Sequence, residues 1–179
     1  MTEAGNVYGS ALYDLAASEN LSASLLDEIQ ALEESFLREP DFLRLLSSPN
    51  VAKTQRCQIL DDSFSGKLHP YVLNFLKILT EKGYIRHFSD CCKAYREHYY
   101  QDNGILPVTA VTAVPLTPSQ TDALTQKLCA ITGKKILLTN RLDESIIGGV
   151  RLDYDGKRLE DTITHRLESV RSVLSSAVL

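Results

Sequence analysis

The stretch Gln101-Asp102-Asn103-Gly104-Ile105-Leu106-Pro107-Val108-Thr109-Ala110-Val111-Thr112 separates two parts of the chain that differ in periodicity. Before Gly104, apolar residues recur every three or four positions, which is the spacing of one helix face. After Gly104, a run rich in β-branched residues predicts a strand. We therefore predict an α+β protein, with an N-terminal bundle of about six helices over residues 1–104 and a small C-terminal α/β domain over residues 105–179.

Apolar stripes mark the first two helices. The first helix is predicted from residues at positions i, i+3, i+4, i+7 and i+8, namely Tyr8, Ala11, Leu12, Leu15 and Ala16. The second carries a stripe of Leu25, Ile29, Leu32 and Phe36. Ser22 or Ser24 is expected to cap the second helix, because a serine hydroxyl accepts a hydrogen bond from a free backbone N–H at that place.

Proline and glycine mark the ends of the other helices in this part. Pro40 and Pro49 bracket a short third helix, and a fourth stops near Gly66. The fifth helix is expected to begin at Pro70, which suits a first turn, and to end at Gly83, which suits a left-handed cap. The sixth follows and ends before the strand. Such short connections are usual in helical bundles.

The second part of the chain is predicted to alternate strands and helices. The strand over residues 105–114 contains Pro107, which is tolerated near a strand start or on an edge. A helix follows that begins at Thr117 or Ser119 and ends at Gly133, and a strand over residues 135–139 comes next. A last helix is expected to be capped by Asp161 or Thr162 and to pack on the sheet by one apolar side, made of Ile163, Leu167, Val170 and Leu174.

Gly148 and Gly149 pose the question of a phosphate site. A phosphate-binding loop needs a helix start directly after its glycines, so that free N–H groups face the anion. Here Val150, Leu152 and Tyr154 follow with strand spacing. The next pair, Asp155 and Gly156, is a strong hairpin signal. We therefore predict a bulge and a hairpin, in which the glycines bend a sheet.

Charge and hydropathy argue against nucleic-acid and membrane binding. Residues 1–104 carry a net charge of −5 and residues 105–179 carry +1, whereas a nucleic-acid-binding protein needs a clustered basic face. No apolar stretch approaches the ~20 residues that span a bilayer, since Lys77 interrupts the best candidate. The N-terminus lacks the basic start and apolar run of a secretory signal.

Nothing in the sequence indicates catalysis, a cofactor or a metal. The four cysteines fall in no metal-ligand spacing and are expected to be reduced: Cys57, Cys91, Cys92 and Cys129. Of the adjacent pair, one thiol is expected in the core and the other partly exposed. The segment Thr132-Gly133-Lys134-Lys135 resembles the tail of a P-loop but lacks the earlier glycine. The histidines are scattered along the chain.

Three blocks of the sequence resemble one known family. Residues 7–16 (VYGSALYDLA), residues 75–84 (FLKILTEKGY) and residues 142–152 (LDESIIGGVRL) followed by residues 159–168 (LEDTITHRLE) are similar to the delta subunit of bacterial F-type ATP synthase, a relative of the mitochondrial oligomycin-sensitivity-conferring protein. Gly9, Lys82 and Asp153 depart from the usual family residues. These departures concern local partner contacts.

The resemblance implies a non-catalytic stator subunit that links the catalytic head to the peripheral stalk. In this family the N-terminal bundle holds the amphipathic N-terminal helix of an alpha subunit between its first and fifth helices. The matching positions here are Tyr8, Ala11, Leu12, Phe75, Leu76, Ile78 and Leu79. Small residues such as Gly9 and Ala11 would let that helix approach closely. The alternative is that these side chains fill the bundle core, and for Leu12, Phe75 and Leu76 both interpretations stay open.

The resemblance also implies that the C-terminal domain binds the C-terminal region of the b subunits. The last helix, with Leu167, Val170 and Leu174, either contacts b or covers the sheet. The expected location is the cytoplasmic face of the bacterial cell membrane, with membrane contact only through the complex. No homo-oligomer, cofactor or nucleic acid is expected.

Two other classes of function give different expectations. A helical nucleic-acid-binding regulator with a small α/β ligand domain would need a basic recognition helix, and none of the six helices is strongly basic. A nucleotide-using enzyme that depends on Gly148 and Gly149 would be stabilised against heat by ATP or NAD. The sequence favours the stator subunit over both.

Overall fold

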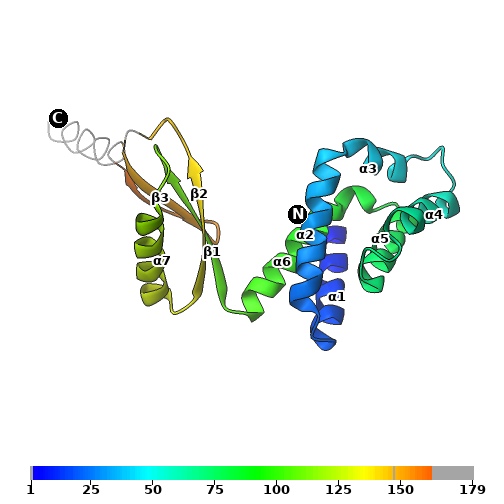
Figure 1. Cartoon of the computed structure of the whole chain (residues 1–179), viewed down its shortest axis with the longest axis horizontal. Helices are drawn as coiled ribbons and strands as arrows, with labels where there is room; N and C mark the ends of the chain where they lie inside the picture. The colour runs from blue at the N-terminus through cyan, green and yellow to red at the C-terminus, as the bar shows by residue number, and fades with distance from the viewer. Residues whose placement is uncertain (1, 147, 163–179) are drawn as a thin grey trace, which may run out of the picture. The chain divides into compact units, whose positions relative to one another are not determined.

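The computed structural model describes residues 2–146 and 148–162 (Figure 1). The chain forms two units that divide between Tyr99 and Tyr100. The last bundle helix, which ends at Asp102, crosses this division by three residues, and the predicted boundary at residue 104 falls just after the end of that helix. Each unit is described by itself.

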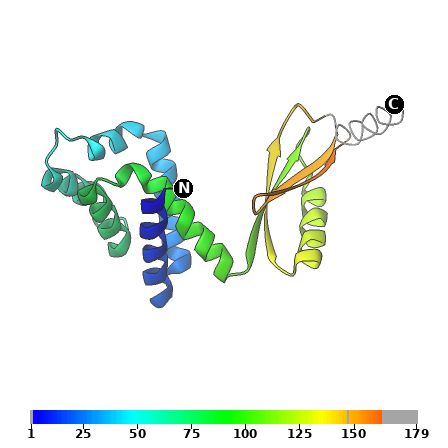
Figure 2. The same cartoon turned by 180° about the vertical axis from the view of Figure 1, so that it is seen from behind.

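The first unit is a bundle of α-helices joined by short connections (Figure 2). Its elements are α1 (Glu3–Ser18), α2 (Ser22–Arg38), α3 (Pro40–Ser47), α4 (Lys53–Phe64), α5 (Pro70–Lys82), the 3-10 turn η1 (Ile85–His87) and α6 (Phe88–Asp102). The predicted bundle of about six helices is confirmed. Pro70 lies in the first turn of α5, and Gly83 ends that helix with a left-handed φ of 79°.

The start of α2 differs from the prediction. Its N-cap residue is Leu21, which forms no side-chain cap hydrogen bond, so the expected serine cap is wrong. A tight turn replaces the cap, because Asn20 adopts a positive φ of 57° and the Leu21 N–H donates to the Ala16 carbonyl at 2.8 Å. The Tyr95 hydroxyl donates to the Ser22 carbonyl at 2.9 Å and ties this turn to α6.

The face that α1 buries also differs from the predicted stripe. The residues of α1 that are buried are Gly5, Gly9, Leu12, Tyr13 and Ala16. Ala11 and Leu15, which the periodicity assigned to the same stripe as Leu12, are exposed. Because α1 has apolar residues on more than one side, its spacing predicts a helix without deciding which side meets the bundle.

Two glycines decide which side of α1 faces inward. A Cβ atom on Gly5 would lie 2.4 Å from the Cβ of Asp90, and one on Gly9 would lie 2.4 Å from the Cys91 carbonyl oxygen and 2.8 Å from the Cβ of Ala94. The backbones of α1 and α6 therefore approach too closely for any larger residue. At the end of this contact the Thr2 N–H and hydroxyl donate to Asp90 at 3.0 and 2.7 Å.

The second unit is a four-stranded sheet with a helix against one face (Figure 1). Its described elements are β1 (Ile105–Thr112), α7 (Pro118–Thr132), β2 (Lys135–Leu142), β3 (Gly149–Tyr154) and β4 (Lys157–Thr162). The strand order is β2-β1-β3-β4, with β1 and β2 parallel and the other pairs antiparallel. This arrangement confirms the predicted α+β class.

The core of the second unit lies between the sheet and α7. Val108, Ala110 and Leu152 are buried there, and Leu124 and Leu128 of α7 pack against them. Pro107 is accommodated although β1 is a central strand. It pairs with Leu137 on the β2 side, whereas pairing with β3 begins only at Thr109. Its missing N–H therefore costs no hydrogen bond to β3.

The predicted C-terminal helix lies outside the described residues. Both of its candidate caps, Asp161 and Thr162, belong to β4, where they pair with Val150 and Gly149. The strand thus extends through the positions expected to cap the helix.

We predict that Gly9→Ala destabilises the bundle by about 1–3 kcal/mol, because the new methyl group meets the backbone of α6. In a helix, Gly→Ala alone would stabilise by roughly 0.5–1 kcal/mol, so the sign of the change is informative. Urea denaturation followed by circular dichroism measures it. Asn6→Ala, at an exposed position of the same helix, is the control and should cause little loss. A more stable Gly9→Ala protein would contradict the close contact between α1 and α6.

Asp90 should make stability depend on pH. Hydrogen bonds from Thr2 hold the pKa of this carboxyl below its ordinary value of 3.8. A lowered folded-state pKa gives stability that is present above the unfolded pKa and is lost as pH falls through the folded pKa. The difference in urea midpoint between the wild type and Asp90→Asn should therefore be constant above about pH 5 and shrink below pH 3.8. A difference that does not change with pH would exclude this role.

Candidate partner-binding surfaces

The seven residues predicted for the alpha-subunit groove lie at two depths in the bundle. Four of them are buried in the core: Leu12, Phe75, Leu76 and Leu79. Tyr8 is half-buried, Ala11 is exposed, and Ile78 is 36% exposed. Tyr8, Ala11 and Ile78 are therefore the residues of this set that are accessible at the surface of the bundle. The four buried residues hold α1 and α5 in place.

Three further apolar or aromatic residues on or next to these elements are exposed, although the sequence did not assign them to the groove. Val7 is 58% and Leu15 41% exposed on α1, and Tyr84, which follows the C-cap Gly83 of α5, is 40% exposed. The rings of Tyr8 and Tyr84 have centroids 5.7 Å apart, which joins α1 to the end of α5. We call this set the α1–α5 strip: Val7, Tyr8, Ala11, Leu15, Ile78 and Tyr84.

Gly9 does not belong to the α1–α5 strip. The sequence predicts that it admits a foreign helix, but the structure places it against α6, inside the bundle. The signal that points to this position is the spacing of Gly5 and Gly9. Residues four apart lie on the same side of a helix, so the pair marks a face that another helix approaches closely.

Exposed apolar side chains on two neighbouring helices suit the binding of an amphipathic helix. In such recognition the apolar face of the ligand helix fills a slot between receptor helices. Each aliphatic side chain that becomes fully buried contributes about 1.5–3 kcal/mol. The small side chain of Ala11 leaves room for close approach.

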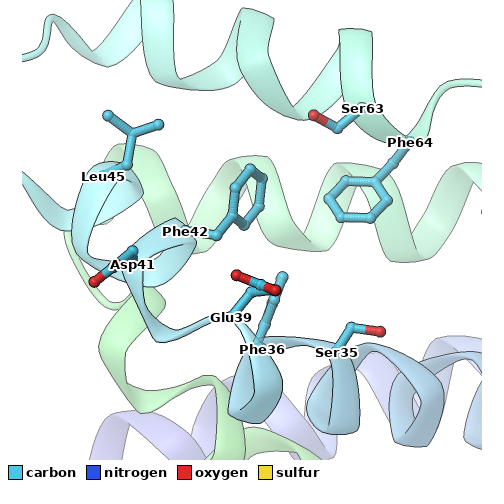
Figure 3. A pocket seen from close by; sticks show the side chains of 8 residues that line it. All are labelled: Ser35, Phe36, Glu39, Asp41, Phe42, Leu45, Ser63 and Phe64. Carbon is cyan, nitrogen blue, oxygen red and sulfur yellow. The ribbon is translucent and has the colours of Figure 1, made fainter.

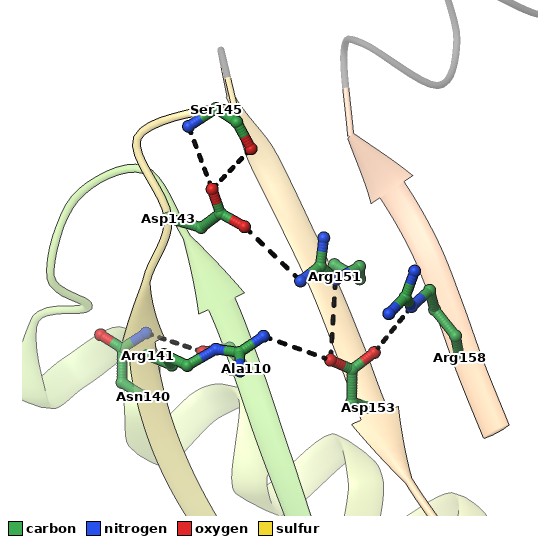
Figure 4. Close-up of polar contacts among 8 residues, drawn as sticks. All are labelled: Ala110, Asn140, Arg141, Asp143, Ser145, Arg151, Asp153 and Arg158. Carbon is green, nitrogen blue, oxygen red and sulfur yellow. Dashed lines mark hydrogen bonds and ion pairs between the residues drawn. The ribbon is translucent and has the colours of Figure 1, made fainter. Parts of the chain in front are cut away.

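The C-terminal residues predicted to contact b, namely Leu167, Val170 and Leu174, lie outside the described residues. The described sheet offers a charged face instead (Figure 4). Asp153 lies 3.1 Å from Arg158, 3.6 Å from Arg151 and 3.8 Å from Arg141. Arg151 and Asp153 flank Leu152, which packs towards α7, and successive side chains of a strand point to opposite faces. The charges therefore lie on the face away from α7.

Asp143 extends this charged face. It lies 3.6 Å from Arg151 and accepts hydrogen bonds from the N–H and hydroxyl of Ser145, which lower its pKa (Figure 4). Asn140, on β2, has a different role. Its amide donates to the Ala110 carbonyl and accepts from the Leu116 N–H, both at 2.9 Å, and so fixes the connection between β1 and α7.

The glycine-rich signature forms a hairpin. Gly149 starts β3 with a φ of 91°, and Asp155 and Gly156 adopt φ values of 48° and 68° between Tyr154 and Lys157. The predicted hairpin is confirmed. The predicted bulge is not found in the described pairing, which runs from Gly149 to Tyr154 without an extra residue. Gly148 precedes the strand, and the stretch leads into β3, so the helix that a phosphate loop requires is missing from this place.

The two adjacent thiols lie in the core of the bundle. Cys91 and Cys92 are both buried, so the expectation that one is partly exposed was wrong. Burial raises the pKa of Cys91 to about 12, which keeps the thiol protonated and unreactive. Within residues 2–146 and 148–162, no three His, Cys, Asp or Glu residues lie close enough to hold a metal ion. In the same residues, no helix is long and apolar enough to cross a membrane.

These features define a class of protein: a two-unit binding subunit, with a helical bundle that exposes an apolar strip and a small α/β unit that exposes a charged face. The sequence model of the family "ATP synthase delta (OSCP) subunit" matches residues 5–174. The chain belongs to this family.

The sequences of known relatives match this chain over nearly its whole length. The chain is 28% identical to ATP synthase subunit delta of Clostridioides difficile (strain 630), over 97% of this chain and 96% of that protein. It is 32% identical to ATP synthase subunit delta of Lactobacillus gasseri, over 96% of this chain and 94% of that protein. A chain in the cryo-EM structure of the Toxoplasma gondii mitochondrial ATP synthase hexamer has the same fold, with a TM-score of 0.76 at 18% identity, over 97% of this chain and 98% of that one.

Family membership confirms the predicted class of function. This chain is a structural stator subunit of ATP synthase that partners with other subunits of that membrane-associated complex, and it is not a catalytic subunit. The alternative of a nucleic-acid-binding regulator has no support.

Proposed function

We propose that this subunit binds the N-terminal helix of an alpha subunit through the α1–α5 strip and the C-terminal region of the b subunits through its second unit. It would do so on the cytoplasmic face of the bacterial cell membrane. One observation carries the first half of this proposal. The core of the bundle is complete, yet five apolar or aromatic side chains of α1 and α5, together with Tyr84 just beyond α5, stay accessible.

An amphipathic helix fits this strip for physical reasons. The accessible residues of α1 recur at positions 7, 8, 11 and 15, so they form one continuous line along the helix. Ile78 and Tyr84 provide the second side. A ligand helix with apolar residues at i, i+3, i+4 and i+7 would place them between these two lines.

The proposed work is mechanical. A stator keeps the catalytic head from turning with the rotor, so it needs attachment at two places and no reactive group. Two binding surfaces on one chain make the second attachment intramolecular, which raises the overall strength without any new contact. Buried, protonated thiols such as Cys91 are compatible with this passive role.

The proposed b-binding residues are Leu167, Val170 and Leu174. Their spacing gives one apolar side on a helix. The support for assigning them to b is the family membership of residues 5–174, which include all three.

Ala11→Arg should weaken binding of a synthetic peptide with the alpha N-terminal sequence of the same organism by at least tenfold, because the change places a charge in the apolar contact. Calorimetry measures the affinity. Since Ala11 is exposed, far-UV circular dichroism should stay nearly unchanged. The matched control is Ala31→Arg, the same change at an exposed position of α2, which should leave affinity intact. Unchanged affinity of Ala11→Arg would place the alpha site elsewhere.

Val170→Asp tests the second attachment. It should reduce capture of a soluble fragment from the C-terminal region of b by at least tenfold, because a carboxylate would replace an apolar contact. Binding of the alpha peptide to the same protein serves as the internal control and should not change. Loss of both activities would indicate a folding defect, and loss of neither would mean that Val170 does not contact b.

A further inference from the structure

The bundle also exposes large apolar side chains on helices other than α1 and α5. Within residues 2–99, the exposed large apolar residues are Val7, Leu15, Leu37, Leu45, Ile78 and Tyr84. Four of these belong to the α1–α5 strip. The other two, Leu37 at the end of α2 and Leu45 on α3, are 74% and 40% exposed. The alpha-binding proposal leaves these two unexplained.

Leu45 lies at the edge of an open groove between α2, α3 and α4 (Figure 3). The groove has a volume of about 490 Å³, and its lining residues are Ser35, Phe36, Glu39, Asp41, Phe42, Leu45, Ser63 and Phe64. We call it the α2–α4 groove. Three phenylalanines and a leucine make its lining mainly apolar.

The aromatic rings of the α2–α4 groove are held in fixed positions. The ring of Phe42 is stacked on Phe36, with centroids 5.8 Å apart, and meets Phe64 edge-on at 5.9 Å. Phe36 is itself buried and packs edge-on against Phe88 of α6 at 5.1 Å. The rings come from three helices and support one another. An apolar side chain of a ligand would therefore enter a preformed slot. Binding would cost little conformational entropy, because the phenylalanine rings are already ordered.

The charge at the groove has one sign. Glu39 and Asp41 are the charged residues among those that line it. The Asp41 carboxylate pairs with Arg44 at 2.8 Å. The Glu39 carboxylate has no hydrogen-bond or ion-pair partner within the described residues, and Figure 3 shows it beside Phe36 and Phe42. A free carboxylate next to an apolar slot suits a cation carried beside an apolar side chain.

We propose that the α2–α4 groove binds an amphipathic helix of a partner protein that carries an apolar side chain and a neighbouring Lys or Arg. The apolar side chain enters between Phe42, Phe64 and Leu45, and the cation pairs with Glu39. A membrane surface is the less suitable occupant, because the carboxylate of Glu39, unpaired among the described residues, repels anionic lipid head groups. This surface is separate from the α1–α5 strip, so both helices can be bound by one chain.

The test uses the full-length protein and a designed amphipathic peptide of roughly 15 residues, long enough to form a helix. The peptide carries Trp and Leu on one face and a Lys beside them, and a second version has Glu in place of that Lys. The protein contains no Trp, so peptide emission and anisotropy report binding without background. The Lys peptide should bind in a saturable manner, with a blue shift of Trp emission, and the Glu peptide should bind several-fold more weakly.

Two variants separate the two parts of the site. Glu39→Lys should lower the affinity for the Lys peptide roughly tenfold, since the attraction between Glu39 and the peptide Lys becomes a repulsion between two cations. The same variant should raise the affinity for the Glu peptide. Leu45→Ser should lower the affinity for both peptides, because it removes an apolar contact. Both positions are exposed, so thermal denaturation should show folded proteins. Asn6→Ala, at an exposed position of α1 that belongs to neither surface, is the control and should bind both peptides like the wild type. Ala11→Arg reports whether any peptide occupies the α1–α5 strip.

Four results would overturn the inference. They are no saturable binding of the Lys peptide to the folded protein, equal affinity for the Lys and Glu peptides, binding insensitive to Leu45→Ser, and loss of binding in Ala11→Arg but not in Glu39→Lys. The last result would show that the peptide occupies the α1–α5 strip. None of these results bears on whether the alpha peptide binds there.

Discussion

The close contact between α1 and α6 is the constraint on which the binding surfaces of the bundle depend. Gly5 and Gly9 bring the backbone of α1 so near to α6 that a Cβ atom on either would lie 2.4 Å from its neighbour. Once this face points inward, Val7, Ala11 and Leu15 lie on another side of the same helix and stay exposed. The inner contact of α1 therefore creates its outer surface.

The same logic explains why the bundle can be a receptor and still be stable. Its core contains large buried side chains such as Leu76, Leu79 and Tyr95, and they do not require the exposed strip for their packing. A ligand helix adds burial to a framework that is already complete. A protein that carries mechanical load benefits from such a framework, since rigid receptor surfaces lose little entropy on binding.

Local signals predicted the elements of this chain well. Gly83 and Gly133 end their helices with left-handed φ values of 79° and 68°, and Asp155-Gly156 makes the predicted turn, because these features depend on residues adjacent in sequence. The predictions that failed concern contacts between distant residues. Asn20 and Tyr95 replace the serine cap of α2, and the packing of α6 buries both Cys91 and Cys92.

The sequence by itself determined the α+β fold class, with helices before Gly104 and strands after it. It also determined the hairpin at Asp155-Gly156 and the family, since periodicity, caps and motifs are local properties of the chain. Only the tertiary structure decided which apolar residues remain accessible. Leu12 and Leu15 look alike in sequence, but one is buried and the other is exposed. Leu45 and Phe42 likewise form a groove only because α2 and α4 bring Phe36 and Phe64 beside them. Exposure depends on neighbours far away in the chain, and the spacing of apolar residues along one helix does not specify those neighbours.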